Sequence, residues 1–244
     1  MNAGTDPTSG GSVISLPSGG GAVSGLGEKF SPDLFTGTSN LSVPIAVPPG
    51  RQGATPQLAL TYSTGNGNSP FGLGWALGVP GVARKTSRGV PRYDGTDVFI
   101  LSGAEDLVPV PGAAAGRQRY RPWTEGLFAR IEHVGDATGD YWEVGGRDGT
   151  RSWYGTPRPH DADASWRDPA VTVVPGGGRT FAWKLTETAD ACGNLTRYSY
   201  LRDHGDELGH RWDQPLLARI VTRHPMLAPG PRQVAVHQRD LRTT

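Results

Sequence analysis

The chain has 244 residues, and its 36 glycines and 21 prolines predict many turns and few long helices. Its 24 Lys and Arg residues balance 23 Asp and Glu residues, so no net field favours nucleic acid or an anionic membrane as a partner. The single cysteine, Cys192, excludes an internal disulfide framework and lacks the second Cys or nearby His of a zinc knuckle. We expect Cys192 to be a small, partly buried residue.

The first 21 residues are dominated by Gly, Ser, Thr and Pro, and carry too little apolar surface to offset the entropy lost on ordering. We predict a flexible leader over 1–21 and a folded domain over 22–223. The leader lacks the basic start and apolar core of a classical signal peptide. No apolar run approaches the length of about 18 residues that a membrane helix needs, so direct membrane insertion is not expected.

A first pair of apolar stretches shows a period of two. Apolar residues alternate from Leu41 to Val47 and again from Leu58 to Tyr62, with a Pro-Pro-Gly turn signal between them. This pattern predicts a β-hairpin. Pro44 lies inside the first strand and cannot donate to a ladder, so an edge position or a bulge is expected there.

The segment "RKTSRGVPRYDGTDVFILSGAEDLVPV", residues 84–110, is dense in charge. Its basic and acidic clusters consist of Arg84, Lys85, Arg88, Arg92, Asp94, Asp97, Glu105 and Asp106. Two explanations are open: the clusters are the two halves of an active site, or they lie at the rims of a hairpin. The alternation favours a hairpin with strands Val98–Leu101 and Leu107–Val110, and with a polar turn at Glu105 and Asp106.

The second half of the chain repeats this alternation. Six more strands are expected, at 127–133, 141–144, 152–154, 179–190, 194–201 and 215–222. Asp148 and Gly149 form a dipeptide typical of hairpin turns, and no segment of ten residues shows a period of 3.6. We therefore predict an all-β fold of mostly antiparallel hairpins with few or no long helices, because the connections are too short for helical crossovers.

Several pieces of this sequence occur together in one known family. In chain order they are "VPIAVPPGR", "PFGLGW", "PRYDGTDVFILSGAEDLVP" and "DGTRSWYG", within residues 16–223. In content and order the chain resembles the N-terminal domain shared by the Salmonella plasmid virulence protein B and the B components of insecticidal toxin complexes.

This resemblance implies a β-rich module that precedes propeller-like and YD-repeat regions. In the toxin complexes such a module forms part of the wall of a hollow shell around a cytotoxic C-terminal segment, so the resemblance implies a curved sheet or part of a β-shell. It also implies other toxin-complex subunits or downstream YD-repeat regions as partners, and secretion of a protein made in the bacterial cytoplasm. The family's enzymatic activity, where present, belongs to other regions.

One segment, "DACGNLTRYSY" at residues 190–200, resembles a YD repeat. Gly193 and Asn194 can supply the positive φ of a tight turn. Tyr198 and Tyr200 fall on one face of the following strand, where aromatic neighbours stabilise stacked hairpins. A true repeat unit and a chance match of one copy both remain open.

No catalytic constellation is recognisable. ADP-ribosyl transfer, which the resemblance associates with a separate C-terminal domain, uses a Glu-X-Glu pair, and the glutamates here include no pair two residues apart. The H-E-x-x-H, G-x-S-x-G and P-loop motifs are also missing from the sequence. We predict a non-catalytic structural module of a secreted virulence or insecticidal toxin, and assign no catalytic, cofactor or metal residue.

Aspartates near turn glycines allow a calcium site as an alternative. They are Asp94, Asp97, Asp136, Asp140 and Asp148. None follows the EF-hand or the nonapeptide pattern, and an Asp beside a Gly also caps its own turn. Two roles are therefore open for these aspartates, calcium binding and turn capping.

Tryptophans are spaced at about one for each predicted hairpin. They are Trp75, Trp123, Trp142, Trp153, Trp166, Trp183 and Trp212. Buried rings would build a core, whereas a coplanar exposed row would make a carbohydrate-binding or host-surface-binding module. The exposure of the rings discriminates between these two functions.

The tail, residues 224–244, loses the family resemblance and has no obvious closing strand. We expect it to be irregular, at the end of a truncated or frame-shifted gene or of a gene fragment. Sheet edges would then stay uncovered, and exposed edges pair promiscuously.

Overall fold

The computed structural model of the chain describes residues 29–33, 38–47, 55–69, 71–102, 105–112, 114–124, 126, 128–136, 139–174, 176, 178–223 and 232–235. The predicted leader over 1–21 lies outside these ranges. Within them every regular element is a strand, none is a helix, and every strand pairing is antiparallel. The prediction of an all-β, antiparallel fold is confirmed.

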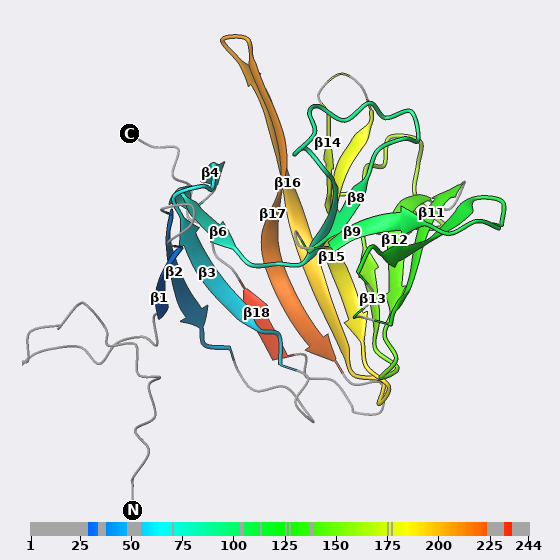
Figure 1. Cartoon of the computed structure of the whole chain (residues 1–244), viewed down its shortest axis with the longest axis horizontal. Helices are drawn as coiled ribbons and strands as arrows, with labels where there is room; N and C mark the ends of the chain where they lie inside the picture. The colour runs from blue at the N-terminus through cyan, green and yellow to red at the C-terminus, as the bar shows by residue number, and fades with distance from the viewer. Residues whose placement is uncertain are drawn as a thin grey trace, which may run out of the picture.

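The N-terminal part forms a small sheet in the order β1-β2-β3-β6 (Figure 1). Its strands are β1 (Lys29–Asp33), β2 (Thr38–Ile45), β3 (Leu58–Ser63) and β6 (Trp75–Leu77). A separate two-stranded ribbon consists of β4 (Asn68–Ser69) and β5 (Gly72–Leu73). The predicted hairpin is the β2–β3 pair, in which Leu41 lies opposite Tyr62 and Ile45 opposite Leu58.

Pro44 lies at a local edge of the sheet, as expected, and not in a bulge. Strand β2 lies between β1 and β3, and its register with β3 is regular through Pro44 and Ala59. The pairing with β1 ends at Ser42. Among the described residues Pro44 therefore has a ladder on one side only, and its missing N–H is accommodated on the other side.

Eight strands close into a barrel. In order around the ring they are β7 (Gly81–Arg84), β8 (Phe99–Leu101), β9 (Glu105–Pro109), β10 (Arg117–Pro122), β11 (Arg130–Asp136), β12 (Gly139–Gly145), β13 (Arg151–Tyr154) and β15 (Thr180–Ala189). Strand β15 pairs with β7 through Trp183 and Val82, and with β13 through Glu187 and Trp153, which closes the ring. Alternate residues of each strand therefore face the barrel interior and its outer surface.

Four strands extend the barrel sheet beyond the ring. They are β14 (Val171–Val173), β16 (Leu195–Glu207), β17 (His210–Arg223) and β18 (Arg232–Ala235). β14 and β16 pair with β15, β17 pairs with β16, and β18 pairs with β17. The tail that was expected to be irregular thus contributes β18, a strand of four residues, which is too short for its alternation to identify it in the sequence.

Strands β16 and β17 form a hairpin of 13 and 14 residues. Leu195–Arg197 pair with β15, and Arg219–Thr222 pair with β18. The distal part, Leu201–Gln214, projects from the body as a two-stranded ribbon (Figure 1), and we call it the arm. The sequence predicted β16 only as far as Leu201 and β17 only from Pro215.

Aromatic side chains fill the barrel. Trp142 and Trp183 are 0 % exposed, and Phe99 packs edge-on against both, with ring centroids 4.9 and 5.8 Å away. His133 stacks on Trp142 at 4.5 Å and 18°, and its Nε2 lies 2.7 Å from Oδ1 of Asp140. The barrel interior is therefore a packed core.

The small sheet shares this core with the barrel. Leu58 of β3 belongs to the same buried cluster as Trp142, while Ile45, Leu77 and Val79 pack against it. Because one cluster spans both sheets, they are packed as one structural unit.

Candidate functional site

The two charged clusters of residues 84–110 meet in the structure. Arg84 Nη1 lies 2.8 Å from Asp97 Oδ2, and Arg84 Nε donates to the Thr180 carbonyl oxygen at 2.9 Å. Asp97 also accepts hydrogen bonds from the backbone N–H groups of Arg92 and Tyr93, both at 2.8 Å. Burial opposes ionisation of Asp97, but these donors and Arg84 together lower its pKa.

A second ion pair joins Lys85 Nζ to Asp106, at 2.6 Å. Asp106 and Glu105 lie inside β9 and not in the polar turn that was predicted, because β9 begins at Glu105, opposite Leu101. Both ion pairs fasten the connection between β7 and β8 to the barrel, and Arg88 and Arg92 stay exposed. The paired charged residues of this segment therefore have a structural role, which is to hold the β7–β8 connection in place.

The aspartates considered for calcium make other interactions. Asp94 accepts hydrogen bonds from Thr96, and Asp148 from Thr150, each through backbone N–H and hydroxyl. Those bonds lower the pKa of both carboxyl groups. Asp140 contacts His133. Among the described residues no three His, Cys, Asp or Glu side chains are grouped to hold a metal ion.

The YD-like segment folds as the sequence predicted. Asp190 Oδ1 accepts hydrogen bonds from the backbone N–H of Cys192 and Asn194, and Gly193 has a φ of 81°. Tyr198 and Tyr200 are both buried on one face of β16. The expectation of a partly buried cysteine is wrong: Cys192 is exposed, because it lies in the turn itself.

The tryptophans do not form an exposed row. Trp142 and Trp183 are fully buried, and Trp123 is 78 % exposed. The other four are partly buried, and they are Trp75, Trp153, Trp166 and Trp212. One ring, Trp153, lies on the outer surface of the barrel beside a cavity.

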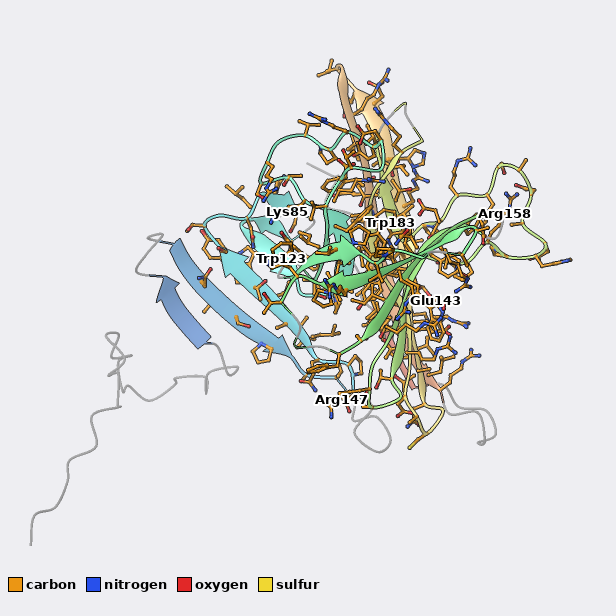
Figure 2. The ribbon with its side chains drawn as sticks, turned by 45° about the vertical axis from the view of Figure 1, so that its right-hand side comes forward. Lys85, Trp123, Glu143, Arg147, Arg158 and Trp183 are labelled. Carbon is orange, nitrogen blue, oxygen red and sulfur yellow. The ribbon has the colours of Figure 1, made fainter. Side chains whose placement is uncertain are left out.

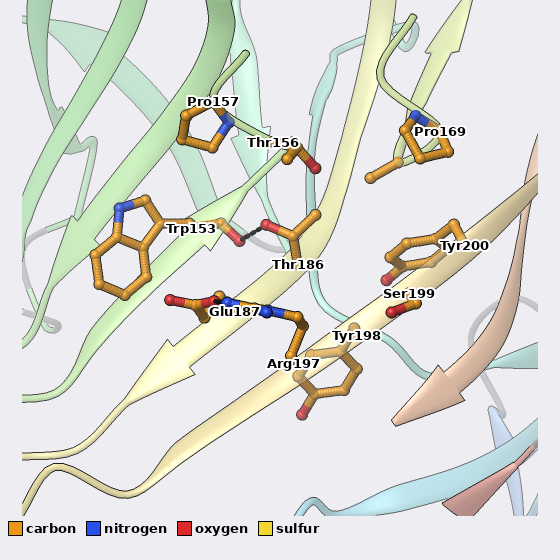
Figure 3. A pocket seen from close by; sticks show the side chains of 11 residues that line it. Trp153, Thr156, Pro157, Pro169, Thr186, Glu187, Arg197, Tyr198, Ser199 and Tyr200 are labelled. Atoms are coloured by element: carbon orange, nitrogen blue, oxygen red, sulfur yellow. Dashed lines mark hydrogen bonds and ion pairs between the residues drawn. The ribbon is translucent and has the colours of Figure 1, made fainter. Parts of the chain in front are cut away.

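This cavity has a volume of about 430 Å³ and lies between β15, β16 and the segment that links β13 to β14. Figure 3 shows Trp153 and Pro157 on one side, Pro169 and Tyr200 on the other, and Tyr198 below. The remaining wall is polar and consists of Thr156, Thr186, Glu187, Arg197 and Ser199, with Ala170. Aromatic rings and prolines therefore line a space with an ion pair at its rim.

Asp168 fixes two walls of the cavity. Its Oδ2 accepts a hydrogen bond from the Thr156 N–H and its Oδ1 accepts one from the Ala170 N–H. Burial raises the pKa of Asp168, and these two bonds oppose the rise. Tyr200 is held by its hydroxyl, which donates to the Leu185 carbonyl oxygen at 2.7 Å. The cavity is therefore preformed.

The outer surface beside the cavity carries what we call the arginine face. It consists of Arg117, Arg119, Arg130, Arg151, Arg197, Glu132, Glu143, Glu187 and Trp153. Cross-strand register places six of these residues opposite one another from β10 to β16, in the order Arg119, Glu132, Glu143, Trp153, Glu187 and Arg197. Opposed residues of antiparallel strands share a face, so the row is continuous across the outer surface, where Figure 2 labels Glu143.

The glutamates of this face lie among the guanidinium groups. Arg117 Nη1 is 3.5 Å from Glu132 Oε2 and 3.6 Å from Glu143 Oε2, and attraction to Glu143 raises the pKa of Arg117. Glu187 Oε2 accepts hydrogen bonds from Nε and Nη2 of Arg197 at 3.0 and 2.8 Å.

These carboxylates are covered and the arginines are not. The side-chain exposures of Glu132, Glu143 and Glu187 are 8, 21 and 26 %. Those of Arg117, Arg130, Arg151 and Arg197 are 41, 69, 62 and 59 %. The face therefore presents mainly guanidinium groups to solvent.

The family is decided by comparison with known proteins. The family model described as Salmonella virulence plasmid 65kDa B protein matches residues 33–223. The chain belongs to this family. It is 34 % identical over 215 residues to the mono(ADP-ribosyl)transferase SpvB of Salmonella choleraesuis strain SC-B67, covering 80 % of the chain and 34 % of that relative. The Salmonella typhimurium protein of the same name is 34 % identical over 214 residues, covering 79 % of the chain and 33 % of the relative.

Solved structures of related proteins share the fold. A chain of the TcdB2-TccC3 crystal structure matches 86 % of this chain at 31 % identity and a TM-score of 0.66, and this chain covers 11 % of it. The Photorhabdus luminescens Tc holotoxin pore matches 86 % at 30 % identity, with a TM-score of 0.63 and 10 % of that chain covered. The N-terminal domain of the effector protein SpvB from Salmonella typhimurium strain LT2 matches 76 % at 27 % identity, with a TM-score of 0.60 and 65 % covered.

These matches confirm the resemblance noted in the sequence. The chain spans about a third of the length of its curated Salmonella relatives and about a tenth of the matched toxin-complex chains. Members of this family thus carry the domain as one part of a longer polypeptide.

Sequence reasoning missed the arginine face and the cavity. One signal was present: Arg117 and Arg119 alternate along β10, which places two guanidinium groups on one side of a strand. The cavity gave no such signal, because residues from β13, the β13–β14 connection, β15 and β16 form it together.

Proposed function

We propose that the chain is a non-catalytic structural module of a secreted bacterial toxin, and that it helps to form or dock the container of a toxic segment on another region or chain. The observation that carries this proposal is the match of 86 % of the chain to one tenth of a TcdB2-TccC3 chain, at 31 % identity. A domain retained at that identity inside a much longer toxin chain is a building block of that chain.

The fold supports this role. The barrel closes on itself around a packed aromatic core, and the small sheet shares that core. Such a unit is a rigid element that keeps its shape when it joins a larger wall. The partners we propose are other toxin-complex components or YD-repeat regions, and export from the bacterial cytoplasm follows from the same kinship. The described residues contain no helix of the length and apolar character needed to cross a membrane.

The absence of catalysis is also part of the proposal. The Salmonella relatives are named mono(ADP-ribosyl)transferases, yet the chain covers only a third of each of them. The Glu-X-Glu pair used in that reaction does not occur in this sequence. Arg84, Lys85, Asp97 and Asp106, the charged residues that could have formed a site, make structural ion pairs. Transfer of labelled ADP-ribose from NAD onto actin by the isolated chain, with release of nicotinamide, would overturn this part.

The structural role is tested by co-expression with a YD-repeat protein encoded in the same genome. We expect the two chains to co-purify and the partner to increase the yield of soluble protein. Candidate partners come from sequencing the region downstream of the gene. If none of the toxin components encoded there binds the chain in a pull-down, the proposal is wrong.

A carbohydrate-binding module remains the second candidate. Trp153 favours it, because its ring lines a cavity together with Glu187 and Arg197. The burial of Trp142 and Trp183 disfavours it. Binding of the pure monomer to a glycan array, lost in Trp153→Ala, would replace the structural proposal with this one.

A further inference from the structure

We propose that the cavity and the arginine face together bind an extended acidic peptide segment of another protein chain, with an apolar or proline side chain of that segment seated in the cavity. This inference goes beyond the structural role, because it assigns a docking site and the chemistry of its ligand. It rests on four features of the described residues: the charge of the face, its unpaired arginine, the lining of the cavity and their arrangement in one row.

The charge of the face selects an anionic ligand. Five guanidinium groups stand against three carboxylates, from Glu132, Glu143 and Glu187, which gives a local net charge of 5 − 3 = +2 on a chain whose total is +1. The arginines cover the glutamates. Arginine forms bidentate hydrogen bonds with carboxylates, and it is enriched in protein interfaces while lysine is depleted.

Arg119 has spare capacity for a ligand. It lies opposite Glu132 in the row, and it is exposed. In the described part of the structure its guanidinium makes no hydrogen bond or ion pair. Arg130 contacts Glu132 through Nη2 alone and is 69 % exposed. Both side chains thus keep N–H donors free for an incoming carboxylate.

The cavity supplies an apolar anchor at one end of the row. Trp153, Tyr198, Pro157 and Pro169 contribute rings to its lining. Grooves built from aromatic residues accept proline and other apolar side chains of extended peptides. A volume of about 430 Å³ is in the range of ligand sites. Asp168 holds two of the walls in place, so little ordering is needed on binding.

The arrangement fits an extended chain. The row from Arg119 to Arg197 crosses six strands, or five steps of about 4.8 Å, which is roughly 24 Å along the surface. An extended peptide of about seven or eight residues covers that length. The lining of the cavity also includes Arg197, Tyr198, Ser199 and Tyr200, consecutive residues of one strand. Alternate side chains point to opposite faces, so β16 presents its edge to the cavity at the end of the row.

A protein segment fits this face better than a nucleic acid or a membrane. Glu132, Glu143 and Glu187 are interspersed among the arginines and would repel a continuous line of phosphates. An acidic segment places separate carboxylates between them and avoids that repulsion. An aromatic core with an arginine rim is also the anatomy of a protein interface.

The test uses the full chain and a fluorescein-labelled peptide in which a Leu-Pro-Leu core is flanked on each side by a run of glutamates. The symmetry of this peptide allows binding in either chain direction. We expect saturable binding with a dissociation constant of about 1 mM or tighter. Arg119→Glu should weaken binding roughly fivefold, since it replaces an attraction by a repulsion on an exposed site. Ser199→Trp, at an exposed strand position, should weaken it at least as much by filling the cavity.

Arg88→Glu is the matched control, because it makes the same charge change at an exposed residue outside the face. It should leave the dissociation constant within about twofold, since salt screens the effect of a distant surface charge. The same peptide with lysine in place of every glutamate should bind at least about tenfold more weakly than the acidic one.

Four outcomes would overturn the proposal. They are absence of saturable binding to the acidic peptide, equal binding of the lysine peptide, no difference between Arg119→Glu and Arg88→Glu, and no effect of Ser199→Trp. Tighter binding of a single-stranded oligonucleotide or of phosphatidylserine vesicles, lost in Arg119→Glu, would instead assign the face to that ligand. The test needs no toxin partner, so its failure is distinguishable from failure of the co-expression experiment.

Discussion

The barrel and the arm are built from the same kind of strand but are held together differently. In the barrel, Trp142 and Trp183 are removed from solvent, so burial of apolar surface stabilises the ring. In the arm, Leu208 at the tip is 102 % exposed. Pairs of side chains across its two strands stabilise the arm instead. An alternating sequence can thus stabilise a core or a projecting ribbon, depending on what its side chains meet.

The arm shows which pairs replace a core. Arg202 Nε donates to Asp213 Oδ1 at 2.7 Å, and this hydrogen bond raises the pKa of Arg202. The ring of Trp212 lies across Gly205, where an added Cβ would come within 2.3 Å of it. Glycine leaves the space for that ring. A two-stranded hairpin alone is marginal in water, and such contacts are what keep this one ordered.

The largest expected effect comes from removing a barrel tryptophan. Trp183→Ala deletes a ring packed against Phe99 and Trp142, and removes the hydrogen bond from its Nε1 to the Asp140 carbonyl oxygen. We expect the free energy of unfolding to fall by about 3–5 kcal/mol in urea titrations. Trp212→Ala, in the arm, should change it by less than about 1 kcal/mol. Equal losses would show that the two regions are not distinct.

Within the arm, breaking the covered ion pair is expected to have the next largest effect. Arg202→Ala leaves Asp213, whose side chain is 11 % exposed, without its guanidinium partner. Hydrogen exchange should then show the arm opening more easily by about 1–2 kcal/mol, with barrel amides unchanged. Arg211→Ala, at a pair that is 62 and 51 % exposed, should move exchange by at most about 0.5 kcal/mol. Similar shifts for the two variants would contradict the contrast drawn between covered and exposed pairs.

A lysine on a barrel strand offers a substitution that is expected to stabilise the protein. Burial lowers the pKa of Lys184, and in the described structure its ammonium group makes no hydrogen bond or ion pair. Lys184→Met should therefore raise the free energy of unfolding at neutral pH by about 1 kcal/mol. Lys85→Met is the control, because it breaks the ion pair with Asp106 and should give no gain.

The pH dependence of this gain has a defined sign. A lowered pKa means that the folded protein binds fewer protons than the unfolded chain between that pKa and the ordinary value of 10.5. In that window the stability contribution of Lys184 rises with pH. The advantage of Lys184→Met should shrink as the pH approaches 10.5, as measured by urea titrations at several pH values. An advantage that grows with pH would contradict the burial of this ammonium group.

The smallest expected effect on the barrel comes from removing the outer part of the arm. His204 and Asp213 lie opposite each other, so residues 205–212 can be replaced by an Asn-Gly turn. The free energy of unfolding of the barrel should change by less than about 0.5 kcal/mol. A loss as large as that of Trp183→Ala would mean that barrel and arm unfold as one unit.

The sequence predicted the strands whose alternation separates apolar from polar faces. The β2–β3, β8–β9 and β11–β12 hairpins follow from it because one side of each is buried. The arm escaped prediction because Arg202, Asp203, Asp206, Arg211 and Asp213 place charge on both of its faces. Its order comes from pairs across the ribbon, which are visible only when the register is known.

Closure of the barrel could not be predicted from the sequence. Trp153 of β13 pairs with Glu187 of β15, although the loop 155–170 and β14 separate the two strands in the sequence. Nothing local in either strand specifies that partner. The cavity and the arginine face depend on this closure, since it brings β13 beside β15. The individual turns, by contrast, were predictable from Asp148 and Asp190, because their capping bonds reach only two to four residues along the chain.

Closure of the barrel also has a consequence for the newly made chain, because β7 must wait for its partner β15 to be synthesised. Val82 of β7 and Trp183 of β15 are neighbours in the ring but are separated by 183 − 82 = 101 residues. At ribosomal speeds of about 5–20 residues per second, β15 is synthesised roughly 5–20 s after β7. Throughout that interval β7 has one side without a partner, and an uncovered strand is prone to pair with other chains. A chaperone that shields the nascent segment 81–179 should therefore matter more to the yield of this protein than one that acts after release.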